Sequence, residues 1–419
     1  MAFLLVIVVG SRVQRVDASH LSTIVCTDGP TFNLETTDGY ATFPDGNSIY
    51  FWGFADSDSG GAFQYPGPTL CVHVGDTVTV NLTNHLAEPV SIVFPGQMNV
   101  SASGDGGTGL FTAEAAPSGG TATYSFVASD PGTYLYESGT MPQKQIEMGL
   151  FGALVVRPPV VNGDEYYAYD DPATRYHPDY EYLLLLHEVD PELHQAVERG
   201  DEFDVTGRHD RYWTINGRSN PDTLYGNGVP WLPNQPYGSM VTIQPYDETQ
   251  NPHPALIRYA NAGLENHPFH PHGNHLRIIA QDGRLLQGSG GEDLSFEGFT
   301  RTVGSGQTYD LLVTWRNLGS GDLSNPNPFS SSSNPIPESP EGVSFPGLFN
   351  KVDFEDGFFS GSPYLGEQED RLAWAIPYNE CGEIYFPWHS HALNEVQNFD
   401  EGFGGMLTLW RIEPLGGCQ

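Results

Sequence analysis

The sequence predicts an all-β protein that contains two β-sandwich domains. Short apolar runs recur between turns, and several show the alternation of apolar and polar residues that is typical of half-buried strands. Gly and Pro are frequent, with 49 and 33 residues, and they are spread along the chain as in turn-rich β proteins. No long helical pattern appears between Ile24 and about Pro158. The length of 419 residues allows two or three domains of ordinary size.

The first domain is expected over residues 20–158. Its alternating runs, at 48–52, 77–82 and 121–126, each place every second side chain on one face of a strand. Turn residues separate these runs at close spacing. This pattern favours a β-sandwich over a mixed α/β domain.

The second domain is expected over residues 159–419. The polar, aromatic stretch 166–177 is interpreted as a linker, and residues 191–199 are predicted to form one short helix. Residues 317–346, rich in Ser, Asn, Pro and Gly, are interpreted as a long loop inserted in this domain. Strands are predicted at 182–187, 212–216, 239–244, 255–259, 276–280, 308–315, 383–388 and 406–412.

The net charge of −35 results from a scarcity of basic residues, since Lys and Arg together number only 17. The only lysines are Lys144 and Lys351, and the chain contains no basic run. Nucleic acids and anionic membranes attract proteins through such basic runs. We therefore expect neither as a partner.

The N-terminus resembles a secretory signal peptide over residues 1–18. Residues 2–9 form an apolar run that is too short to span a bilayer, and residues 16–18 offer a cleavage site. No membrane insertion is expected after its removal. The mature chain is expected to be secreted, periplasmic or at the cell surface.

The cysteines are even in number and widely spaced, which favours two disulfides in an exported protein. No Cys-x-x-Cys pair is present, so a zinc knot is not indicated. Three pairings remain open. The four residues are Cys26, Cys71, Cys381 and Cys418.

Two histidine clusters, more than a hundred residues apart, are the chemical signature of this chain. The stretch 267–275 contains His270 and His272, and a second cluster contains His389 and His391. Residues i and i+2 of a strand point to the same face, so each pair can aim at one target. If the two segments are neighbouring strands, four imidazoles converge. For one pair alone, an ordinary surface or core role would be the better interpretation; two pairs in one domain favour a metal site.

Imidazole binds copper, zinc, iron and nickel, so the ligands alone do not select the metal. His275 has the wrong strand parity to join His270 and His272, and it is interpreted as a supporting or structural residue. No nucleophile elbow of the Gly-x-Ser-x-Gly type occurs, so a hydrolase of that class is not indicated.

Several motifs resemble those of the multicopper oxidases, which are built from cupredoxin β-sandwiches. The resemblance extends over nearly the whole mature chain and implies two cupredoxin-like Greek-key sandwiches. It implies copper as the cofactor, with zinc or another divalent metal as the alternative, and a homotrimer by analogy with small two-domain relatives. The motifs that carry it are 65–70, 74–76, 132–136, 148–156, 215–218, 258–263, 267–273 and 281–283.

The chain departs from this family at the type 1 copper. The family has His-Cys-His where this chain has His389-Ser390-His391, and a protonated hydroxyl cannot replace a soft thiolate. The next type 1 histidine of the family falls at Glu395. His267 and Met406 remain from that site as weaker candidate ligands. We therefore expect no blue copper centre.

The first-domain ligands are also replaced. The family's His-Trp-His-Gly aligns with residues 93–96, which begin with Val93, and its next His-Ser-His aligns with residues 137–139. Glu137 is either a further weak ligand or an ordinary edge-strand acid. The resemblance thus leaves His270, His272, His389 and His391 as the metal ligands. It predicts a metal-binding oxidoreductase with an incomplete copper set, and the alternative is a non-catalytic binding or surface-structural protein that has lost its copper.

Overall fold

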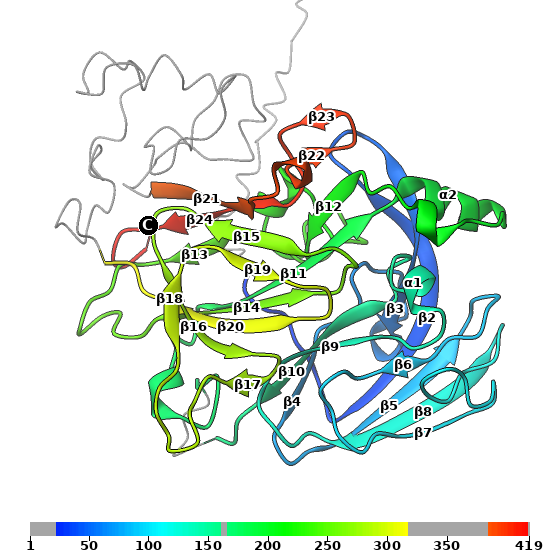
Figure 1. Ribbon diagram of the computed structural model, residues 1–419, viewed down its shortest axis with the longest axis horizontal. Helices are drawn as coiled ribbons and strands as arrows, with labels where there is room; N and C mark the ends of the chain where they lie inside the picture. Colours follow the sequence, from blue (N-terminus) through cyan, green and yellow to red (C-terminus); the bar gives the residue numbers. More distant parts are fainter. Residues whose placement is uncertain (1–21, 161–165, 317–383, 418–419) are drawn as a thin grey trace, which may run out of the picture.

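The computed structural model describes residues 22–160, 166–316 and 384–417, and it confirms the predicted all-β fold with cupredoxin-type sandwiches. The strands form four sheets, two from each half of the described chain (Figure 1). The candidate signal peptide, the loop 317–346, Cys381 and Cys418 lie outside the described residues.

The first sandwich packs two five-stranded sheets face to face. One sheet has the order β1 (Thr27–Asp28), β4 (Leu70–His73), β10 (Phe151–Arg157), β9 (Gly132–Ser138) and β6 (Ile92–Val93). The other has the order β3 (Ser48–Asp56), β2 (Thr31–Thr42), β5 (Thr77–Asn84), β8 (Gly120–Val127) and β7 (Ser101–Gly104). The alternating run in β8 buries Ala122, Tyr124 and Phe126 in the core between the sheets, as its period of two predicts.

The second sandwich has one large and one small sheet. The large sheet runs β17 (Arg284–Leu285), β16 (Leu276–Gln281), β20 (Thr308–Val313), β14 (Ala255–Asn261), β11 (Glu181–Val189), β12 (Tyr212–Ile215), β22 (Gln397–Asn398) and β23 (Glu401–Gly402), with β18 (Phe296–Gly298) paired to β16. The small sheet runs β13 (Val241–Ile243), β24 (Leu407–Ile412), β21 (Ile384–Ser390), β15 (His267–Pro271) and β19 (Arg301–Val303).

Strand β11 is buried on both faces, which explains its continuous apolar run. Leu184 and Leu186 point into the core of the second sandwich. Leu183 and Leu185 point the other way, into an apolar layer that also contains residues of the first sandwich, such as Phe51. The two sandwiches therefore share a hydrophobic interface in addition to their own cores.

The stretch 166–177 is packed rather than extended between domains. Tyr169 and Tyr176 are 3% and 1% exposed, and both contribute to a small core with Leu256 and Leu312 of the second sandwich. The Tyr169 hydroxyl donates to Asp310 Oδ2 over 2.5 Å. The aromatic content that marked this segment in the sequence thus reflects burial.

Helices are few and short among the described residues: α1 (Pro142–Gln145), α2 (Pro191–Arg199) and several 3₁₀ turns. The predicted helix 191–199 is confirmed as α2. Asp190 caps it by accepting hydrogen bonds from the amides of Glu192 and Leu193, Pro191 occupies the first turn, and Gly200 ends it in the left-handed region.

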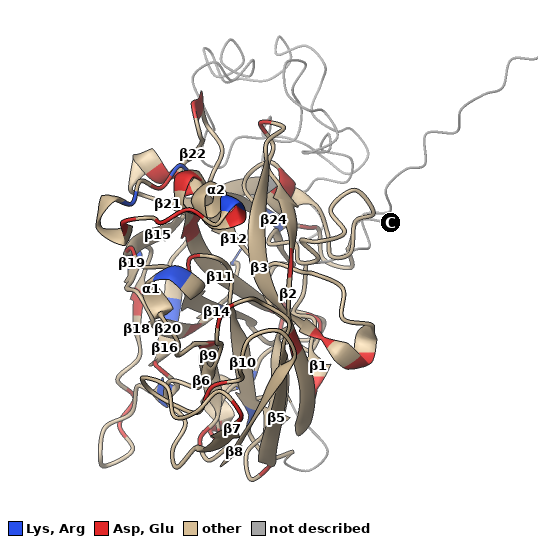
Figure 2. Cartoon of the chain, turned by 90° about the vertical axis from the view of Figure 1, so that its right-hand side faces the viewer, with Lys and Arg blue, Asp and Glu red and all other residues tan. Residues whose placement is uncertain are grey.

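Acidic residues are distributed over the described chain and basic ones are sparse, as Figure 2 shows. In the described parts of the chain, no helix has the length and apolar character needed to cross a bilayer. Cys26 and Cys71 form one disulfide, which connects β4 to the segment before β1.

Candidate metal centre

The four candidate histidines lie on the neighbouring strands β15 and β21 or directly after their ends (Figure 1). The antiparallel register pairs His270 directly with His389, so both side chains leave the small sheet on the same face. His272 and His391 follow two residues later in their own segments and extend this face. Strand parity and strand pairing together create the cluster.

The four imidazole rings lie close together. Ring centroids are separated by 4.8 Å for His270 and His272, 4.9 Å for His270 and His391, 5.1 Å for His272 and His389, and 5.7 Å for His389 and His391. The Nε2 atoms of His272 and His389 are 3.0 Å apart. The sequence-based expectation that these residues face one another agrees with this geometry.

Neighbouring groups fix the orientation of two rings. His389 Nδ1 donates to the carbonyl oxygen of Ser390 over 2.6 Å, because a carbonyl can only accept. The Nε2 atom of neutral His389 therefore carries a free lone pair toward His272. His270 Nδ1 contacts Thr300 Oγ1 over 2.6 Å. Its Nε2 atom is not part of this hydrogen bond and is the ring nitrogen that remains for a metal. Hydrogen bonds of this kind orient metal-binding histidines.

The environment favours neutral rings. Burial, followed by the neighbouring imidazoles His389 and His391, lowers the pKa of His270 to about 4. Burial and the surrounding histidines lower the pKa of His272 to about 4 as well, and burial also lowers the pKa of His389. Neutral imidazoles at neutral pH are the form that binds a metal ion.

The donor set fits a soft or borderline transition metal. With bonds of about 2.0–2.1 Å, two ligands of a tetrahedral ion lie ~3.3 Å apart, close to the separation of the His272 and His389 Nε2 atoms. No three metal-binding side chains among the described residues are yet arranged around a single point. His270 and His391 must therefore turn their rings toward this pair to complete a site.

His267 lies on the opposite face of β15 and takes no part in the cluster. Its Nδ1 donates to Glu395 Oε2 over 2.8 Å and its Nε2 donates to Glu188 Oε2 over 3.0 Å. Burial alone would lower the pKa of His267, but the two carboxylates outweigh it and raise the pKa to about 9. Both ring nitrogens are thus protonated and occupied, so this imidazolium has no lone pair for a metal.

Glu188 anchors this network on the side of β11. Its Oε1 accepts from Arg208 over 2.6 Å and from the amide of Glu265 over 3.0 Å. Its pKa lies well below the usual range, because hydrogen bonds and the charges of His267 and Arg208 outweigh its complete burial. A buried ion network therefore occupies the place where the family resemblance put a type 1 copper.

The other positions of that site supply no thiolate. Ser390 is buried, and its hydroxyl oxygen accepts from the amide of Ala392 over 3.2 Å. Met406 is fully buried in the hydrophobic core of the second sandwich. A serine and a core methionine give copper no thiolate.

Glu137 lies on β9 in the first sandwich, and the structure does not bring it to the four histidines. It pairs directly with Val93 of β6, so the two aligned first-domain ligand positions are neighbours in space. Burial raises the pKa of Glu137 to about 7. Among the described residues its carboxyl group has no hydrogen-bond or ion-pair partner.

Sequence reasoning missed Glu188, Arg208 and Thr300. Glu188 carried a usable signal, because it interrupts a buried apolar strand, where a charged residue is rarely found without a partner. Nothing in the sequence pointed to Thr300. It contacts His270 only because the segment between β18 and β19 folds back next to β15.

Comparisons with known proteins agree with this fold. Residues 60–160 match the sequence profile of a family described as multicopper oxidase. The chain is 26% identical over 268 residues to an L-ascorbate oxidase of Cucurbita maxima, covering 60% of this chain and 41% of that protein. It is 37% identical over 97 residues to an L-ascorbate oxidase of Cucurbita pepo var. melopepo, covering 23% of this chain and 17% of the relative. The matched regions thus span less than half the length of these curated relatives.

A solved structure extends the comparison to nearly the whole chain. The blue copper oxidase of Nitrosomonas europaea superimposes with a TM-score of 0.56 over 91% of this chain and 85% of its own, at 20% identity. At that identity the similarity concerns the fold.

Proposed function

We propose that the chain is a member of the multicopper oxidase family, which its profile match over residues 60–160 supports, and that it is an oxidoreductase that binds copper through His270, His272, His389 and His391. The observation that carries the proposal is the convergence of four imidazoles from β15 and β21, with two Nε2 atoms 3.0 Å apart. Zinc is the competing metal, because it takes the same ligands.

Each protein group has a defined role in this proposal. The Ser390 carbonyl holds the Nδ1 proton of His389, so that Nε2 offers its lone pair. The Thr300 hydroxyl is hydrogen-bonded to His270 Nδ1 and holds the orientation of that ring. Copper, when bound, supplies one-electron redox chemistry at this site. The thiolate route by which the family passes electrons to its coupled coppers is missing here, so the substrate must reach the four-histidine site itself.

A titration of the native protein with Cu(II) and with Zn(II), each monitored by calorimetry, tests the proposal. We expect metal binding at one site, and its loss in His270→Ala/His389→Ala. The matched control is His73→Ala/His85→Ala, which removes two histidines of the first sandwich outside the cluster and should leave binding unchanged. Equal binding by all three proteins would refute the assignment and support the non-catalytic alternative.

We also propose that three copies assemble so that the first sandwich of each covers the histidine face of the next. Exposed apolar side chains support this arrangement. Phe299, which is 51% exposed, lies beside His270, while the first sandwich exposes Met98, Leu110 and Phe111 at 63%, 72% and 65%. Burial of such exposed apolar side chains in an interface would stabilise it. Light scattering in solution should give the mass of three chains, and a monomer would contradict it.

An extracytoplasmic location completes the proposal. The disulfide between Cys26 and Cys71 supports it, because such bonds persist in oxidising compartments. Fractionation of the native source organism should recover the protein outside the cytoplasm.

A further inference from the structure

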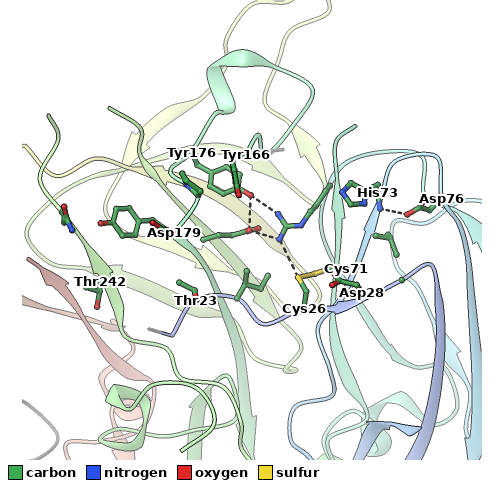
Figure 3. Close-up of a pocket in the computed structure, with 18 of the residues that line it drawn as sticks. Thr23, Cys26, Asp28, Cys71, His73, Asp76, Tyr166, Tyr176, Asp179 and Thr242 are labelled. Atoms are coloured by element: carbon green, nitrogen blue, oxygen red, sulfur yellow. Dashed lines mark hydrogen bonds and ion pairs between the residues drawn. A yellow bond between two sulfur atoms is a disulfide. The ribbon is translucent and has the colours of Figure 1, made fainter. Parts of the chain in front are cut away.

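A cleft of about 820 Å³ opens between the two sandwiches, and none of the four clustered histidines lines it (Figure 3). Its walls come from β1, β4 and β10 on one side and from β11, β13 and the segment 176–180 on the other. The volume lies within the range of small-molecule sites, which is about 300–1,000 Å³, and such sites favour the junction of two domains. The histidine proposal makes no use of this cleft.

The walls are partly apolar and aromatic. Tyr166, Tyr176 and Tyr180 contribute rings, and Ile24 and Val72 contribute aliphatic surface. The hydroxyl of Tyr176 is already engaged by Arg157 and Glu181. Tyr176 and Tyr180 are 1% and 8% exposed, so only the edges of their rings face the cleft. Together with Tyr166 they supply a limited apolar surface against which methylene groups and cations can pack.

The charged side chains that line the cleft favour a positively charged ligand. Arg157 is neutralised within the wall by Glu181, whose Oε2 lies 2.8 Å from its guanidinium. By contrast, Asp28, Asp76 and Asp179 have no cationic side chain as an ion-pair partner among the described residues. An anionic ligand would meet three uncompensated carboxylates, whereas a cationic ligand would neutralise them.

The arrangement of these carboxylates favours a long cation over a metal ion. Figure 3 shows Asp28 and Asp76 on one side of the cleft and Asp179 on the other. No three carboxylates or histidines of the described chain are grouped closely enough to hold one ion. A ligand with two or more positive charges on a flexible apolar chain can reach both sides at once, and its methylene groups can lie against the tyrosine rings.

We propose that this cleft binds an aliphatic polyamine. One ammonium group of the ligand pairs with Asp179, a second pairs with Asp28 or Asp76, and the connecting methylene groups contact the wall formed by the tyrosines. This inference is independent of metal binding at the four histidines.

The test is calorimetric titration of the full-length protein with spermidine and with 1,4-diaminobutane, at low and at moderate salt. Butane-1,4-diol, which has the length of the diamine without its charge, should not bind. Asp28→Asn and Asp179→Asn should each weaken spermidine binding about two- to five-fold, the effect of one exposed ion pair. The matched control is Glu202→Gln, which removes one exposed carboxylate outside the cleft and should leave binding unchanged.

Three results would overturn the proposal. Absence of polyamine binding would do so directly. If Glu202→Gln weakened spermidine binding as much as the cleft variants do, the binding would depend only on the net charge of the protein. Binding of Mg²⁺ alone with the same dependence on Asp28 and Asp179 would show a metal site instead.

Discussion

At the scale of single residues, His267 is the most informative, because it is a charged imidazolium at a position where the family resemblance implies a metal ligand. His267 keeps its place, but Glu395 and Glu188 hold both of its ring protons. A positively charged ring between two carboxylates satisfies all of these buried groups at once, whereas any one of them alone would be costly to bury. This ion network lies where the resemblance to multicopper oxidases implies a type 1 copper.

Restoring the cysteine alone should not restore a blue centre. In Ser390→Cys, the thiol gains no second or third ligand, because His267 is protonated and Glu395 is a carboxylate. Visible absorption spectra of the copper-loaded variant should lack the intense thiolate band. Its appearance in this single variant would mean that His267 leaves Glu395 to bind copper.

The His267 network also predicts how stability depends on pH. The folded pKa of about 9 exceeds the unfolded value of about 6.5, so the protonated ring stabilises the folded state fully below about pH 6.5. This contribution is lost as the pH rises toward 9. Urea unfolding of the wild type should show a loss on the order of 3 kcal/mol between pH 6 and pH 9 from this group.

His267→Gln provides the comparison. The variant should be less stable than the wild type at pH 6 and should show a smaller loss between pH 6 and pH 9. His85→Gln, at an exposed histidine paired with Glu35, should keep the wild-type dependence. An unchanged pH profile in His267→Gln would show that other groups control this range.

At the scale of elements, the pairing of β15 with β21 builds the histidine cluster, and apolar residues on the inner face hold that pairing. Phe269 is fully buried and packs against Tyr259 and Trp388. Trp388 in turn donates to the Tyr259 hydroxyl over 2.9 Å. The same two strands therefore present a rigid aromatic core inside and the imidazoles outside.

Phe269→Ala should cost about 3–5 kcal/mol in unfolding free energy, because it leaves a cavity in this core. Metal affinity should also fall, although the four histidines are unchanged, because β15 can shift against β21. Phe299→Ala, at an exposed ring beside His270, should cost less than about 1 kcal/mol. Urea unfolding and metal titration measure the two effects separately; equal stability of both variants would contradict this account.

At the scale of the whole molecule, a buried polar cluster links the two sandwiches. Asp310 on β20 accepts from Thr133 of the first sandwich over 2.5 Å and lies 3.3 Å from Arg258. Arg258 is completely buried and also pairs with Glu181 over 2.8 Å. These bonds add directional contacts to the shared apolar layer and fix how the sandwiches sit against each other.

Removal of the Asp310 carboxylate should therefore strongly lower the stability of the folded protein. Asp310→Ala leaves Thr133 and Tyr169 without their acceptor and removes one of the carboxylates around Arg258, so a loss of about 3–5 kcal/mol is expected. The unfolding transition should broaden as the two sandwiches lose their coupling. Asp293→Ala breaks an exposed pair with Arg277 and should change stability by no more than about 1 kcal/mol.

The sequence by itself determined the fold class, most strand positions, helix α2 and the parity that puts His270 with His272, and His389 with His391, on one face of each segment. These features depend on local periodicity, caps and turn residues, which act between neighbours along the chain. Only the tertiary structure decided that β15 pairs with β21, that 166–177 is packed, and that Glu188 and Glu395 meet at His267. Several of those contacts join residues far apart in the sequence, 128 positions for His267 and Glu395 and 141 for Tyr169 and Asp310. Strand register and burial set them rather than any local pattern.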